Sequence, residues 1–89
     1  MNTLERIEQK LATLVPEHID LRDDSAAHAG HPGAARGGGH YRLTIVSDQF
    51  FGKPTQARHR MVYSALGDML QHEIHALSIK AYTPGEIKI

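Results

Sequence analysis

Histidine is the residue type in this sequence with the clearest capacity for chemistry. Seven of the 89 residues are histidine, and none is cysteine. Imidazole binds metals and titrates near neutral pH. The lack of cysteine excludes disulfides, thiol catalysis and a thiolate metal site supplied by this chain alone. If the chain takes part in binding iron or an iron–sulfur cluster, its own ligands must be imidazoles or carboxylates, and any thiolates must come from a partner.

One histidine, His75, begins the segment that most resembles a final β-strand. Side chains alternate between the two faces of a strand. We therefore expect His75 to share a face with Leu77, Ile79 and Ala81, at the start of an otherwise apolar row. This placement alone favours a structural imidazole over a metal ligand.

The remaining periodicity predicts an α+β domain that would hold this strand. Apolar residues at helical spacing predict a helix that begins at Asn2 or Thr3 and ends before Pro16, and a second helical region over 55–72 with a break at Gly67. Alternating patterns predict strands over 18–24, 40–47 and 75–82. The order is α-β-β-α-(α)-β. We expect a three-stranded mixed sheet covered on one face by helices, with the last strand parallel to the second.

Three connecting segments complete a single domain over residues 1–89. Residues 25–39 contain His28 and His31 among five glycines and a proline, which predicts a flexible loop. Residues 48–54 form a turn whose two phenylalanines we expect to be exposed. Residues 85–89 form a tail that we expect to be loosely ordered.

Charge and composition narrow the classes of function. The formal net charge is zero, which argues against a protein dominated by non-specific phosphate binding. Locally, Lys53, Arg58, His59 and Arg60 make a basic segment. No paired carboxylates or nucleophile elbow are placed for catalysis, so we expect no enzymatic activity. No apolar run approaches the roughly 20 residues of a membrane span, and nothing resembles an export signal, so we expect a cytoplasmic location.

Several motifs together resemble the BolA family. They are Phe51-Gly52-Lys53, Arg58-His59-Arg60-Met61-Val62-Tyr63, Ile74-His75-Ala76-Leu77-Ser78-Ile79 and Thr83-Pro84, with His40-Tyr41-Arg42 and Val46-Ser47 upstream. The pairing of RHR in the helix with IHAL in the last strand is the specific part. The resemblance implies a KH-like domain of the second type, in agreement with the predicted order of elements.

The resemblance also implies a partner and a cofactor. BolA-like proteins bind monothiol glutaredoxins and share a [2Fe-2S] cluster, for which the glutaredoxin and glutathione supply thiolates and the BolA-like chain supplies at least one histidine. The family's strand histidine corresponds to His75. The second ligand lies in the loop: counting forward from Asp23-Asp24-Ser25 selects His28, with a slight preference, and counting back from His40 favours His31. Two imidazoles on one iron would raise the cluster's potential, as in Rieske centres.

DNA binding is the alternative function. BolA-like proteins are also described as transcriptional regulators tied to stress response and cell shape, and nucleic-acid-binding KH domains clamp phosphates with a GXXG loop. No GXXG stands between the predicted helices here, but Lys53, Arg58 and Arg60 are candidate DNA contacts. For the other histidines we expect packing at the loop base for His40, packing on the helix for His59, and a surface position for His18 and His72.

Overall fold

The computed structural model describes residues 2–24 and 39–87. Along the chain these form α1 (Thr3–Leu11), β1 (His18–Asp23), β2 (Gly39–Val46), α2 (Thr55–Leu66), α3 (Met69–His72) and β3 (Ile74–Tyr82), with single 3-10 turns at Ala12–Leu14, Asp48–Phe50 and Pro84–Glu86. The predicted order α-β-β-α-(α)-β is confirmed. None of the helices in the described part of the chain is long and apolar enough to cross a membrane.

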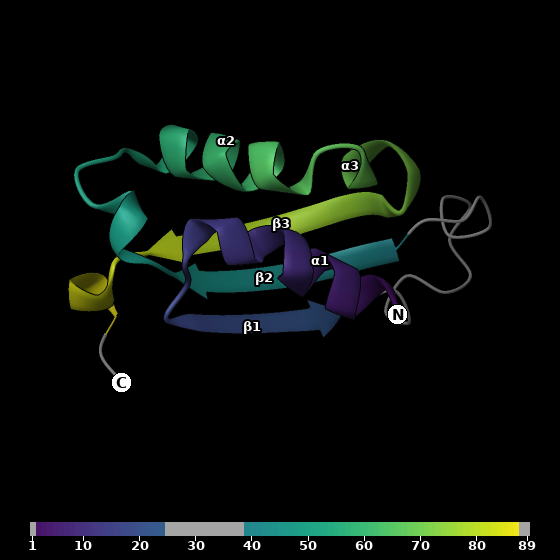
Figure 1. Ribbon diagram of the computed structural model, residues 1–89, viewed down its shortest axis with the longest axis horizontal. Coiled ribbons are helices and arrows are strands. Elements are labelled where there is room, and N and C mark those ends of the chain that lie inside the picture. Colours follow the sequence, from purple (N-terminus) through teal and green to yellow (C-terminus); the bar gives the residue numbers. More distant parts are fainter. Residues whose placement is uncertain (1, 25–38, 88–89) are drawn as a thin grey trace.

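The sheet has three strands in the order β1-β2-β3, with β2 in the centre. β1 pairs with β2 in antiparallel register and β2 pairs with β3 in parallel register, as predicted. Figure 1 shows α1 and α2 on the same side of this sheet, and α3 where the chain turns into β3. The fold is therefore an α+β sandwich with one covered face and one open face.

The core lies between the helices and the covered face. The apolar stripes of the two long helices meet the inward-facing side chains of β2, whose alternation places every second residue in the interior. The buried residues that form this core cluster are Ile7, Leu11, Leu14, Tyr41, Leu43, Ile45, Phe50, Val62, Leu66, Met69 and Ile74.

The predicted helix ends are confirmed, with one irregularity. The Asn2 side chain accepts a hydrogen bond from the Glu5 amide at 2.8 Å, as an N-cap should. After α1 the chain tightens into a 3-10 turn, and Val15 then adopts left-handed backbone geometry, with φ of 47°. The buried Ser47 hydroxyl donates to the carbonyl of Leu14 at 2.6 Å and holds this turn against the end of β2.

Gly67 separates α2 from α3, as the low helix propensity of glycine predicted. Its φ of 55° lies in the left-handed region, which glycine adopts without the steric cost of a Cβ atom. The amide of Gly67 donates to the Tyr63 carbonyl at 3.0 Å and closes α2. This break lets the chain re-enter the sheet at Ile74.

Two expectations about the connecting segments are wrong. The phenylalanines at 50 and 51 were both expected to be exposed, but Phe50 is 0% exposed and only Phe51, at 82%, faces solvent. The 3-10 turn at Asp48–Phe50 turns the two rings in opposite directions. The tail was expected to be loosely ordered over 85–89, but Glu86 ends a 3-10 turn and forms an ion pair with Arg58; residues 88–89 lie outside the described residues. The loop expected over 25–39 lies outside the described residues except for Gly39, which begins β2.

Candidate functional site

His75 lies on a β-bulge at the start of β3. Gly39 pairs with Ile74, but the next residue of β2, His40, pairs with Ala76, so His75 is an extra residue in the ladder. Its side chain is exposed, unlike that of Ile74. The prediction that His75 continues the covered face is therefore wrong: Leu77, Ile79 and Ala81 pack against the core, and the bulge turns His75 away from them.

His40 is the neighbour of His75 that sequence reasoning did not place at the site. The two imidazole rings have centroids 5.0 Å apart, with planes inclined by 45°. His40 is half-buried and was expected only to pack at the base of the loop. The signal was present in the predicted topology, because the strands predicted over 40–47 and 75–82 were expected to be parallel and each begins with a histidine. Parallel strands that start together bring their first side chains together.

The backbone around the two histidines is fixed by close packing. The amide of Gly39 donates to the carbonyl of Glu73 at 3.1 Å, which joins the starts of β2 and β3. A Cβ atom at Gly39 would lie 2.3 Å from ring atoms of Tyr41, so only glycine leaves room for this ring. Glu73 also forms an ion pair with Arg6 of α1. The backbone on either side of the bulge is thus held in place by the contacts of Gly39 and Glu73.

The described residues do not form a complete metal site by themselves. His28 and His31 both lie outside them, so the alternative between these two loop histidines stays open. Within 2–24 and 39–87, no group of three or more histidine, aspartate or glutamate side chains is placed to hold a metal ion. The imidazoles of His75 and His40 carry nitrogen donors of the kind that iron accepts. The donor set suits a cluster or metal whose other ligands come from elsewhere.

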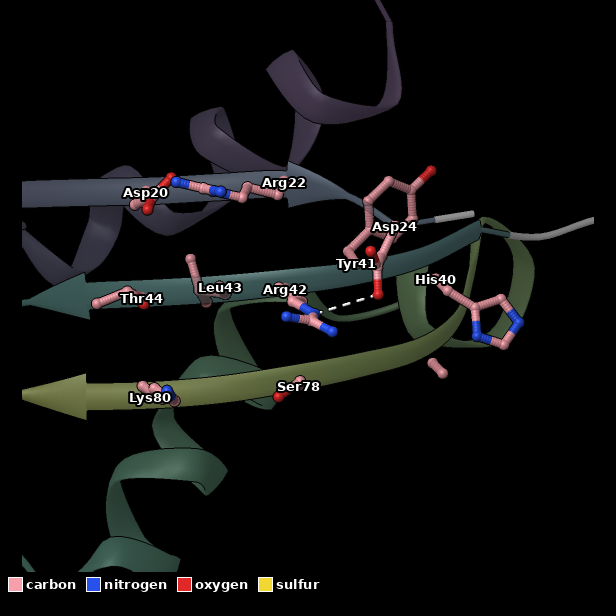
Figure 2. A pocket seen from close by; sticks show the side chains of 11 residues that line it. Asp20, Arg22, Asp24, His40, Tyr41, Arg42, Leu43, Thr44, Ser78 and Lys80 are labelled. Atoms are coloured by element: carbon pink, nitrogen blue, oxygen red, sulfur yellow. Dashed lines mark hydrogen bonds and ion pairs between the residues drawn. The ribbon is translucent and has the colours of Figure 1, made fainter. Parts of the chain in front are cut away.

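The open face of the sheet forms a shallow polar hollow of about 610 Å³. Figure 2 shows Arg42 on β2 turned toward Asp24, and His40 at the end of the hollow where β2 begins. The Nε of Arg42 lies 3.1 Å from Oδ2 of Asp24, and Arg22 is paired with Asp20 at 3.5 Å. Arg42 and Arg22 are thus each paired with a carboxylate, Asp24 and Asp20 respectively. These pairs offset most of the positive charge on this face of the sheet.

The three candidate DNA contacts occupy very different environments. The Arg58 side chain is only 12% exposed and is engaged by the protein itself. Its guanidinium donates to the carbonyls of Lys53 and Ala81 and to both carboxylate oxygens of Glu86. Lys53 and Arg60 are exposed, and no ion pair is formed by either within the described residues. Arg58 is thus committed to internal contacts, whereas Lys53 and Arg60 face solvent.

Glu86 shows the electrostatic effect of this arrangement. The hydrogen bonds from Arg58 and from the amide of Thr83 stabilise the ionised carboxylate and lower the pKa of Glu86 from 4.5 to about 2. The Thr83 amide donates to Oε1 at 2.7 Å. The carboxylate of Glu86 therefore stays charged over the physiological pH range. Through Arg58 it links the turn after β3 to the start of α2.

Three further histidines lie within the described residues. His59 is half-buried on α2, and His18 and His72 are exposed, in accord with the expectations for them.

The order of elements, with a pair of helices between two parallel strands of a mixed sheet, defines a KH-like α+β domain of the second type. A family model described as BolA-like protein matches residues 11–86, and the chain belongs to the BolA family.

Relatives of known name and structure agree with this assignment. The chain is 43% identical over 88 residues to "SufE-like protein 1, chloroplastic/mitochondrial" of Arabidopsis thaliana, covering 92% of this chain and 24% of that protein. It is 39% identical over 80 residues to "DNA-binding transcriptional regulator BolA" of Escherichia coli, covering 89% and 73%. The solved BolA domain of SufE1 from Arabidopsis thaliana matches with a TM-score of 0.82 and 42% identity, covering 98% of this chain and 99% of that one.

The curated relatives are mostly longer than this chain. It spans 24% of the SufE-like protein and 53% of a bovine BolA-like protein 1 that is 41% identical to it. The likeness is therefore to the BolA part of these proteins.

Proposed function

We propose that this chain is a BolA-like adaptor that binds a monothiol glutaredoxin and shares a [2Fe-2S] cluster with it, in iron–sulfur cluster trafficking or iron regulation. The observation that carries the proposal is the placement of His75. It is exposed on a bulge, beside a second imidazole 5.0 Å away, on a backbone fixed by neighbouring contacts. An imidazole that served only packing would be expected on the covered face.

The ligands divide between the two proteins. In this proposal His75 and one loop histidine, His28 or His31, are the ligands from this chain, and the glutaredoxin cysteine and glutathione supply thiolates. Imidazole is neutral where thiolate is charged, so histidine ligation raises the potential of the cluster relative to an all-thiolate site. The ring of His40, whose centroid lies 5.0 Å from that of His75, would limit the orientations that the His75 ring can take.

A titration followed by spectroscopy tests this function. Adding the apo chain to a holo monothiol glutaredoxin should change the visible absorption and circular dichroism of the cluster. His75→Ala should abolish the change, and His28→Ala and His31→Ala, run in parallel, should identify the loop ligand. His72→Ala is the matched control, because His72 is an exposed histidine on α3 three residues away in sequence. An unchanged spectrum with the wild-type chain would contradict the proposal.

A second candidate function is DNA binding in transcriptional regulation of stress response and cell morphology. Two observations favour it: the name of the Escherichia coli relative, and the exposure of Lys53 and Arg60 on a KH-like domain. Binding of a labelled DNA duplex, measured by fluorescence anisotropy, should weaken as salt is raised and with Lys53→Ala. Lys80→Ala, on the open face of the sheet, serves as the control. If no binding is seen at low salt, this function is excluded.

A further inference from the structure

A groove of about 540 Å³ lies between the 3-10 turn Ala12–Leu14, which follows α1, and the helix α2. Figure 1 shows α1, which leads into this turn, and α2 on the same side of the sheet. The lining of the groove is largely apolar. Leu14 contributes from the 3-10 turn, and Ala57, Met61 and Ala65 contribute from successive turns of α2. Apolar side chains at that spacing give the groove a continuous floor along one edge of the helix.

The rim of this groove carries two cations, Lys53 and Arg60. Both are exposed, and neither forms an ion pair within the part of the chain that the structure describes. The residues that line the groove include no carboxylate, and α2 has neither aspartate nor glutamate along its whole length. The groove therefore combines an apolar floor with positive charge that the described protein does not neutralise.

Two exposed apolar side chains lie close in sequence to residues that line the groove. Val15 is 67% exposed and follows the groove residue Leu14 directly, and Phe51 is 82% exposed and lies two residues before Lys53. Val15 also has left-handed backbone geometry, which costs a non-glycine residue roughly 1–2 kcal/mol. Val15 and Phe51 are therefore solvent-exposed apolar residues within two positions of the groove residues Leu14 and Lys53.

We propose that this groove docks an acidic amphipathic helix of a protein partner. Apolar side chains spaced along one face of such a helix would fill the floor, as in other complexes where a helix lies in a groove. Carboxylates beside that apolar face would meet Lys53 and Arg60. DNA fits the groove less well, because a sugar–phosphate backbone offers no apolar side chains for Leu14 and Met61, and two cations neutralise few phosphates.

This surface is separate from the site at His75. The groove is formed mainly by the 3-10 turn Ala12–Leu14 and α2. His75 and His40 instead lie near the starts of β3 and β2. The inference goes beyond the proposed cluster sharing, and the two can fail independently: His75→Ala should abolish the change in cluster spectrum and leave docking in the groove intact.

The probe for this inference is a fluorescein-labelled designed peptide helix with leucines on one face and glutamates beside them. The intact chain should bind it, and labelling the chain with nitrogen-15 should locate the amide shifts at Leu14, Met61 and Ala65. The double variant Lys53→Glu, Arg60→Glu should weaken binding by about tenfold, because two attractions become repulsions. A peptide with glutamine in place of glutamate should bind correspondingly less tightly.

The matched control keeps the change in net charge and moves it to the other face. Arg22→Glu with Lys80→Glu alters two exposed cations on the open face of the sheet and should leave the peptide affinity unchanged. Equal binding of the acidic and the glutamine peptides, or equal losses in the two double variants, would overturn the inference. Tighter binding of a DNA duplex or of vesicles containing phosphatidylglycerol at the same amides would also overturn it, since the occupant would then not be a protein helix.

Discussion

Arg58 joins three segments that are far apart in the sequence, and its replacement should lower stability strongly. The Nε donates to the carbonyl of Lys53 at 2.7 Å, and Nη1 donates to that of Ala81 at 3.0 Å. The guanidinium also forms a two-point contact with Glu86, at 2.5 and 3.1 Å. The start of α2, the end of β3 and the turn after it therefore share one cation. We expect Arg58→Met, which keeps the apolar stem and removes the donors, to loosen all three.

The size of the effect follows from the two main-chain hydrogen bonds. A hydrogen bond from a charged donor contributes about 1.5–3 kcal/mol. The bond to Lys53 is exposed and is counted near 1 kcal/mol, and the part-buried bond to Ala81 near 1.5 kcal/mol, about 2–3 kcal/mol in all. The Glu86 contact is left out because exposed ion pairs contribute little after screening. A domain of this size has a total stability of roughly 5–13 kcal/mol, so the loss is a large share.

Urea unfolding at neutral pH, followed by far-UV circular dichroism, measures this loss. The midpoint should fall by about 1–2 M, given the usual dependence of stability on urea for small domains. Arg58→Lys should lose an intermediate amount, because it keeps the charge but not the planar fork of donors. Arg60→Met is the control: Arg60 is exposed on the same helix, and its replacement should change stability by no more than about 0.5 kcal/mol.

Equal midpoints for Arg58→Met and Arg60→Met would refute this reasoning, since the internal contacts of Arg58 would then contribute nothing. The result also bears on DNA binding. A loss of DNA affinity in an Arg58 variant would accompany a loss of stability, whereas the Lys53→Ala variant tests phosphate contact at an exposed side chain.

Three further predictions concern other parts of the fold. Because Arg58 lowers the pKa of Glu86 to about 2, the stability that Glu86 contributes should be present above about pH 4.5 and disappear as the pH falls toward 2; urea midpoints of wild type and Glu86→Gln should converge over that range, and a constant gap would contradict the assignment. Val15→Asn should raise the free energy of unfolding by about 1 kcal/mol, since asparagine tolerates left-handed geometry better than a β-branched residue; thermal unfolding checks this, and a lower melting temperature would count against strain at this position. Gly39→Ala should cost about 1–3 kcal/mol because its Cβ would displace the ring of Tyr41; an unchanged urea midpoint would show that the ring moves aside freely.

The sequence predicted the fold well because most of its signals are local. Helical spacing of apolar residues, the cap at Asn2, the break at Gly67 and the alternation in β2 each depend on a few neighbouring residues. These patterns placed all of the main helices and strands in the right order. The tight turn at 48–50 was harder, since neighbouring phenylalanines give no sign of which one the turn directs inward.

The site required contacts that the sequence cannot show directly. The bulge at His75 depends on the register between β2 and β3, and the pair with His40 depends on the parallel pairing of strands separated by the whole helical crossover. The contact of Arg58 with Glu86 spans 28 residues. The resemblance to the BolA family named His75 as a candidate, and local composition named the basic residues. Only the assembled fold separated Arg58, which is internal, from Lys53 and Arg60.

The bulge has a consequence for how this position can vary. Because His75 is the residue that the ladder leaves out, the flanking pairs Gly39 with Ile74 and His40 with Ala76 do not depend on its identity. A different side chain there, or a chain one residue shorter, would leave the same residues of β3 facing the helices. The residue at this position can therefore be exchanged or deleted at little cost to folding, whereas a change at an ordinary strand position would disturb the pairing of β2 with β3.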